Sequence, residues 1–217
     1  MDADTIRGAL AGRLSAEGAH WLDETCREVA DEPAVLAAAF PAAGRRCGRG
    51  PLDAAGPELA GWTVDDAART MLLLALTWLD VVGETTRMYY GGDPAEKRAV
   101  LRALPVLDVG EHGVPLVLDA LRSNDTRLVA AAMGPYAADR LDLESWRRGV
   151  LKCVYCGVPL ANVADLHAKA DDRLGRMLAD FAAERRAAGR SVPADVRLVL
   201  DRLDQETRCA SSTRIST

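Results

Sequence analysis

The sequence predicts an all-α fold, a single multi-helix domain built from antiparallel helix pairs. Alanine is abundant, runs of β-branched residues are rare, and aromatic residues make up only 5% of the chain. That composition favours helices over strands. No extended stretch alternates apolar and polar side chains, so no sheet is predicted.

The first part of the chain predicts three helices, at residues 4–14, 17–30 and 33–40. Ser15 precedes the second helix and can cap it, because its hydroxyl accepts a free backbone N–H. Pro33 suits the first turn of the third helix, where its missing N–H is not needed. Residues 41–61 are rich in glycine and proline and predict a loop.

The central helix is predicted at residues 64–80. Thr63 and Asp66 have the spacing of a capping box at its start. The residues that follow are apolar nearly all round the helix, which is typical of a helix buried in the centre of a bundle.

Seven further helices are predicted, at residues 84–90, 94–104, 111–122, 126–133, 143–156, 171–188 and 194–203. Short loops join them, which favours antiparallel neighbours. No self-similar period is present, so the second half predicts an irregular, repeat-like arrangement. We expect one all-α domain over residues 1–204 and a polar, disordered tail over 205–217.

Charge and hydropathy bear on several classes of function. The net charge of −5 argues against nucleic-acid binding, which needs a basic face. The longest apolar run, residues 71–82, is too short to span a bilayer and contains Asp80, so no membrane insertion is expected. The N-terminus has no signal peptide pattern, and the five cysteines form no tight framework. We therefore expect a cytoplasmic protein with reduced thiols and no cofactor.

Several segments together resemble the EboA family. The resemblance is strongest over residues 121–193 and weaker over 44–63. The segments that carry it are Leu121–Asn124, Gly134–Tyr136, Trp146, Leu151–Lys152, Gly157–Pro159, Leu174–Phe181, Glu184–Pro193, Gly44–Pro51 and Gly61–Thr63.

The resemblance implies a bacterial secondary-metabolite pathway rather than a stated reaction. It predicts a component that binds or transforms a small polar metabolite, with phosphorylated metabolites among the candidates, in a pocket between helices. The alternative is a non-catalytic helical scaffold for partner proteins of the same pathway. The sequence leaves open whether the protein is an enzyme.

Lys152 is the first candidate catalytic residue, because it lies among apolar helical neighbours. Such a lysine either extends to the surface or pairs with an acid inside the protein. Asp80 and Glu84 are the acids expected to partner Lys152 or Arg122 and to assist as acid or base. A structural ion pair explains the same pattern without catalysis.

Five other side chains complete the predicted binding site with Arg122: Tyr136, Trp146, Arg45, Arg46 and Arg49. Arg122 can hold a carboxylate or phosphate through its planar fork, or merely stabilise a helix end. The aromatic pair can line a pocket or fill the core. The three arginines lie among glycines, which suits anion binding but also a solvated basic loop.

The pair Cys153 and Cys156 has the spacing of metal ligands. A structural zinc site needs about two more ligands, and the remaining cysteines and histidines are scattered singly. Members of the resembling family usually carry an apolar residue at the second position. Two buried thiols inside a helix are the preferred interpretation, and metal binding is the minority alternative, so no metal site is assigned.

Overall fold

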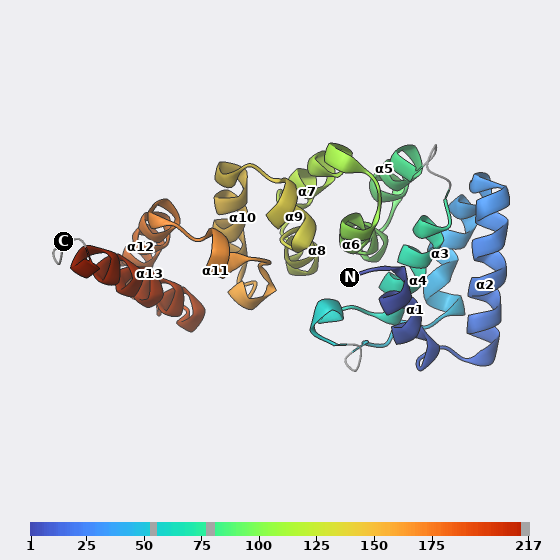
Figure 1. The fold of residues 1–217 in the computed structure, drawn as a ribbon, viewed down its shortest axis with the longest axis horizontal. Coiled ribbons are helices and arrows are strands. Elements are labelled where there is room, and N and C mark those ends of the chain that lie inside the picture. The colour runs from blue at the N-terminus through green and yellow to red at the C-terminus, as the bar shows by residue number, and fades with distance from the viewer. Residues whose placement is uncertain (53–55, 77–80, 214–217) are drawn as a thin grey trace. The chain divides into compact units, whose positions relative to one another are not determined.

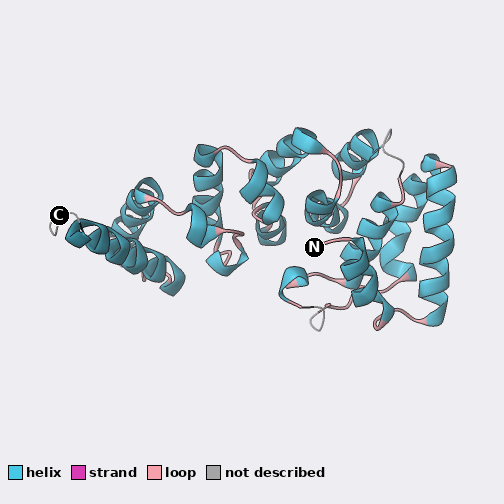
Figure 2. Cartoon of the chain, viewed as in Figure 1, coloured by secondary structure: helices cyan, strands magenta, loops and turns pink. Residues whose placement is uncertain are grey.

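A computed structural model describes residues 1–52, 56–76 and 81–213, without the side chains of residues 57 and 207–213. The predicted all-α class is confirmed: in this described part the chain forms helices and loops, with one isolated bridge between Pro51 and Thr63 (Figure 2). The chain divides into two compact units, Met1–Ser123 and Asn124–Thr217. We call them unit 1 and unit 2.

Unit 1 contains seven α-helices within its described residues (Figure 1). They are α1 (Ala3–Ala11), α2 (Ala16–Asp31), α3 (Leu36–Arg46), α4 (Val64–Leu74), α5 (Val81–Gly91), α6 (Pro94–Ala103) and α7 (Val114–Ala120). The expected caps form at two of them. Ser15 accepts from the N–H of Gly18 at 3.1 Å, and the capping box at Thr63 and Asp66 starts α4.

Helix α4 lies at the centre of unit 1. Every residue from Val64 to Leu73 is buried, polar ones included. Helix α4 packs against α1, α2, α3 and α6. Because an α-helix turns about 100° per residue, Asp66 faces roughly opposite to Met71 and Ala75. The polar and apolar faces of α4 therefore pack against different neighbouring helices.

The described residues of unit 2, 124–213, form six α-helices: α8 (Thr126–Ala132), α9 (Pro135–Arg140), α10 (Leu143–Cys156), α11 (Leu166–Lys169), α12 (Asp172–Ala187) and α13 (Ala194–Thr213). Its core is built around Trp146 and Phe181. Gly157 ends α10 in the left-handed conformation, with φ of 76°, which suits a residue without a Cβ. Helix α13 continues past residue 204, where the sequence predicts the tail to begin.

The end predicted for the third helix, at Phe40, is wrong. The helix runs through Pro41 to Arg46, although a proline inside a helix removes a hydrogen bond. Pro41 lies on the exposed side, whereas Phe40, Ala43 and Gly44 are buried. Burial of that apolar face outweighs the missing hydrogen bond, so packing extends the helix beyond its local signal.

Other boundaries also differ from the sequence prediction. Helix α5 begins at Val81 rather than at residue 84. The short helices α9 and α11 were not predicted, because six and four residues carry too little periodicity to detect. The predicted end of the central helix, residues 77–80, lies outside the described residues.

A helix can cross a bilayer only if it is both long and apolar enough. Among the helices of the described part, none combines the length and apolar character needed to cross a membrane.

Candidate functional site

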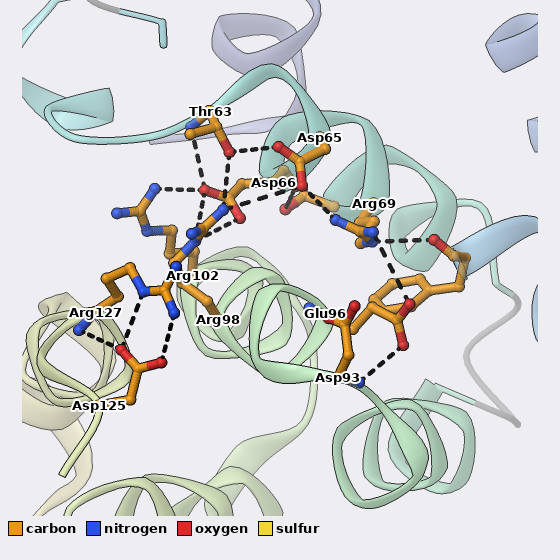
Figure 3. A network of polar contacts seen from close by, with 12 residues as sticks. Thr63, Asp65, Asp66, Arg69, Asp93, Glu96, Arg98, Arg102, Asp125 and Arg127 are labelled. Carbon is orange, nitrogen blue, oxygen red and sulfur yellow. Dashed lines mark hydrogen bonds and ion pairs between the residues drawn. The ribbon is translucent and has the colours of Figure 1, made fainter. Parts of the chain in front are cut away.

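An ionic cluster lies beneath the first turns of α4 (Figure 3). Arg69 donates to Asp65 Oδ2 at 2.6 Å through its terminal nitrogen, and its Nε donates to the Phe40 carbonyl at 3.0 Å. The side chains of Arg69 and Asp65 are 1% and 2% exposed. This pair therefore joins α4 to α3 inside the core.

Asp66 receives two guanidinium groups from α6. Arg98 Nε lies 3.0 Å from Asp66 Oδ1, and an Arg102 terminal nitrogen lies 2.5 Å from Asp66 Oδ2. Asp66 is fully buried. Burial lowers the pKa of Arg102, while the neighbouring Asp66 opposes that shift. Both arginines come from one face of α6, one turn apart.

The ionic cluster is balanced in charge. The side chains of Asp65, Asp66 and Glu96 face those of Arg69, Arg98 and Arg102. Buried charges are tolerated when each is paired and hydrogen-bonded, as here. Since its members satisfy one another, the cluster is suited to fixing α4 against α3 and α6 rather than to holding a ligand.

A pocket of about 590 Å³ lies on the other side of α4, between α1, α2 and α4. Its volume falls within the range of small-molecule sites. Nine of its thirteen lining residues are apolar. The lining residues are Ala3, Arg7, Leu10, Ala11, Leu14, Ala19, Leu22, Asp23, Cys26, Arg27, Met71, Leu74 and Ala75.

The polar side chains are gathered toward one end of this α1–α2–α4 pocket. Figure 1 shows α1 and α2 running in opposite directions from a short connecting loop. Leu14 and Ala19 lie next to that loop, whereas Arg7, Asp23 and Arg27 lie turns away from it. The pocket therefore has an apolar end and a charged end.

Cys26 contributes a thiol to the charged half of the pocket. Burial and, to a lesser extent, nearby Asp23 raise the pKa of this thiol to about 11, while Arg7 opposes the shift. The thiol is consequently protonated near neutral pH and a weak nucleophile. Cys47 is buried behind it, with a pKa that burial likewise raises to about 11.

Lys152, on α10, donates to Asn124 Oδ1 at 3.0 Å. The partner is thus an amide oxygen rather than the acid that the sequence predicted. Asp125, next to Asn124 in sequence, occupies the cap position of α8 and accepts from the Arg127 N–H at 2.9 Å. Lys152 is half-buried at the edge of unit 2. Its catalytic role stays a prediction.

The two predicted aromatic ligand contacts are both buried in unit 2. Tyr136 on α9 is 7% exposed and Trp146 on α10 is 0% exposed. The Lys169 ammonium lies 5.7 Å from the centre of the Trp146 ring and donates to the Ala138 carbonyl. These contacts place Trp146 in the core between helices.

Among the described residues, Glu84 and Arg122 form no hydrogen bond or ion pair with each other or with Lys152. Glu84 pairs with Arg87 on α5, one turn away. Arg122 follows α7 with its side chain exposed. Asp80 lies outside the described residues. The acid–base and binding roles of these three stay predictions.

The predicted arginine loop is partly helical. Arg45 and Arg46 form the last turn of α3, and Arg46 lies 3.9 Å from Glu17. The Arg49 side chain packs over Gly44, where an added Cβ would come within 2.7 Å of its Nε. All three arginines are exposed. Gly44 therefore makes room for a side chain, whereas the sequence suggested backbone amides approaching an anion.

Cys153 and Cys156 lie in the last turns of α10. Cys153 is fully buried, and burial raises the pKa of its thiol to about 12. In the described part of the chain, no group of three or more His, Cys, Asp or Glu side chains is arranged to hold a metal ion.

Unit 2 has a second, more open hollow of about 510 Å³ beside α11 and α13. Leu160, Leu166 and Leu198 are among its lining residues, and Leu198 is 69% exposed. The Asp195 side chain, on α13, accepts a hydrogen bond from the Leu160 N–H at 2.9 Å and so connects two parts of the lining.

Sequence reasoning missed the charged residues of both sites in unit 1. Asp65 and Arg69 are spaced i, i+4 inside an apolar helix, and opposite charges at that spacing are a detectable signal of a buried ion pair. Arg98 and Arg102 have the same spacing but like charges, which places them on one face of α6 without naming their partner. The α1–α2–α4 pocket left no comparable signal, because its lining resembles an ordinary core face.

Comparison with known proteins gives one family. The family model described as "Metabolite traffic protein EboA" matches residues 3–201, which is most of the chain. No curated protein and no solved structure matches the chain significantly.

Proposed function

Because the chain belongs to the EboA family, we propose that it binds a small metabolite in the α1–α2–α4 pocket and carries it. The observation that supports this most is the lining of that pocket. A volume of about 590 Å³ with nine apolar lining residues suits an organic molecule of drug-like size. The family description concerns metabolite traffic, which needs binding and release rather than bond-making.

The chemistry of the pocket favours reversible binding. Cys26 would be its natural nucleophile, but a thiol with a pKa of about 11 is overwhelmingly protonated at neutral pH. Arg7, Asp23 and Arg27 are exposed at the edge, where water screens their charges. The apolar lining favours a ligand with an apolar body, whereas the sequence analysis expected a small polar ligand.

The pathway remains part of the proposal. The EboA resemblance implies secondary-metabolite production or export in bacteria, and the carried molecule would be an intermediate or product of such a pathway. Comparison of metabolites in cells with and without the gene would identify which compound accumulates.

Binding can be tested with N-phenyl-1-naphthylamine, a neutral apolar dye that fluoresces when it leaves water. We expect saturable binding to the full chain, and a loss of about tenfold or more in affinity for Ala19→Phe, which fills the pocket. Ala30→Phe is the matched control, because Ala30 lies on the same helix, is exposed and does not line the pocket.

The control variant should bind the dye like the unchanged protein. Equal dye affinity in the unchanged protein and both variants would rule out the α1–α2–α4 pocket as the site. Circular dichroism of each variant verifies that the helices are retained.

Protein binding is a second candidate function, supported by the hollow beside α11 and α13. Leu198 is 69% exposed and lines this hollow together with Leu160 and Leu166, and contiguous apolar surface can mark a contact site. If unit 2 is a scaffold, Leu198→Asp should abolish co-purification of a pathway protein that the unchanged chain retains, without altering dye binding in unit 1.

A further inference from the structure

The α1–α2–α4 pocket separates apolar and charged side chains along its length. Leu14 and Ala19 lie at the end beside the α1–α2 loop, with Leu10 and Leu22 further along. An entirely apolar ligand would leave the charged end unused. A small polar ligand would leave the apolar end unfilled. The lining therefore matches a molecule with two unlike ends.

The sign of the charged end follows from the partners of its side chains. Arg7 already pairs with Asp4 at 2.9 Å. Arg27 lines the pocket and has no ion-pair partner among the described residues, although Asp23 stands one turn before it on α2. Because Asp4 offsets the charge of Arg7, Arg27 is the guanidinium of this lining that is left, among the described residues, to meet an anion.

A guanidinium without a partner is well suited to an acid group. Arginine presents several N–H donors in a planar fork that fits a carboxylate, sulfonate or phosphate. Its long stem lets the head reach the edge of the pocket while the carbons cover apolar surface. Resting on the proposed function, we propose that the carried ligand is an amphipathic anion, with its apolar body toward Leu14 and its acid group at Arg27.

Two dyes test this assignment because they differ by one charged group. 1-Anilinonaphthalene-8-sulfonate has the ring system of N-phenyl-1-naphthylamine plus a sulfonate. We expect the sulfonate dye to bind the full chain about fivefold more tightly than the neutral dye at low salt. The preference should shrink in 0.5 M sodium chloride, because salt screens exposed charges.

Variants locate the charge. Arg27→Gln should weaken binding of the sulfonate dye far more than binding of the neutral dye, and so remove most of the preference. Asp23→Asn should increase the affinity for the sulfonate dye, since it removes a like charge. Arg13→Gln is the matched control, because Arg13 is an exposed arginine near the apolar end that does not line the pocket. It should change neither affinity.

The outcomes separate this inference from the function it rests on. Equal affinities for the two dyes, or equal losses of both dyes in Arg27→Gln, would overturn the anionic ligand while leaving the pocket in place. A preference lost equally in Arg13→Gln would overturn the assignment to Arg27. If neither dye binds and Ala19→Phe has no effect, both the carrier function and the anionic ligand are wrong.

Discussion

Arg69 and Asp65 form an ion pair across one turn of α4, 2.6 Å apart and almost wholly shielded from water. The same guanidinium holds the Phe40 carbonyl of α3. Two elements far apart in sequence are thus tied by one side chain. Because α4 also forms a wall of the α1–α2–α4 pocket, the stability of this pair bears on the proposed binding site.

The first prediction concerns that pair. Arg69→Met should lower the free energy of unfolding by about 3–5 kcal/mol, because it leaves Asp65 buried without its partner. Adding Asp65→Leu should restore much of the loss. Urea denaturation followed by circular dichroism measures both effects.

An exposed pair supplies the control for this measurement. Arg202 and Glu206 are 42% and 54% exposed, so Arg202→Met should cost below about 1 kcal/mol. A comparably small cost for Arg69→Met would show that the buried pair does not hold α4 in place.

The second prediction concerns the thiol in the pocket. With a pKa of about 11, Cys26 should react with iodoacetamide at a rate that keeps rising from pH 7 to pH 10 without a plateau. N-phenyl-1-naphthylamine should slow the reaction by occupying the pocket. Mass spectrometry of the peptides resolves each cysteine.

Cys47 is the internal comparison for Cys26, because its pKa is raised to the same value but its side chain is 7% exposed. It should react more slowly at every pH. A plateau in the Cys26 rate near pH 8 would contradict the raised pKa.

The third prediction concerns pH. A hydrogen bond and charge from Arg147 lower the pKa of Asp171 below its ordinary value of 3.8. A carboxyl whose folded pKa is depressed stabilises the fold above its unfolded pKa, and this stability is lost as the pH falls through the folded pKa. The stability advantage of the unchanged protein over Asp171→Asn should therefore be full above about pH 5 and shrink in stronger acid.

The expected size of this advantage is below about 1 kcal/mol, because the Asp171 side chain is 38% exposed. Asparagine keeps the side-chain oxygen that accepts from the Leu174 N–H, so the cap of α12 is preserved. Urea unfolding at pH 3 to pH 7 gives the comparison. A difference that stays constant with pH would contradict the pairing with Arg147.

The fourth prediction concerns Trp146. Its ring is fully buried, and its Nε1 finds no hydrogen-bond partner among the described residues. Trp146→Ala should lower the free energy of unfolding by about 3–5 kcal/mol through the cavity it leaves. Trp146→Phe should cost much less, because it keeps a buried ring and removes a polar group without a partner. Equal costs for the two variants would contradict the assignment of this stabilisation to the volume of a buried ring.

The sequence predicted the all-α class and most long helices because those features are local. Helix α10 begins and ends where its signals place it, from the cap at Asp142 to the left-handed Gly157. Helix α3 does not, because the burial of Phe40 outweighs Pro41, and burial depends on the partners of the helix.

The sites were harder to predict for the same reason. Asp65 and Arg69 are near in sequence, but the arginines that meet Asp66 come from α6, more than thirty residues later. The α1–α2–α4 pocket is the space between three apolar faces, and hydropathy alone does not distinguish a filled interface from an open one. Lys152 looked unusual in sequence, yet its described hydrogen bond is to Asn124, whose position only the fold reveals.

The three walls of the α1–α2–α4 pocket differ in how firmly they are anchored. The buried residues of helix α1 are Ile6 and Leu10. Detaching this helix would expose both side chains to water at a cost of about 3–6 kcal/mol. Moving α4 would instead separate the buried ion pairs. We therefore expect helix α1 to be the wall most readily displaced, and its brief local unfolding would give the proposed ligand a way in and out. Amide hydrogens of α1 should exchange with solvent long before those of α4.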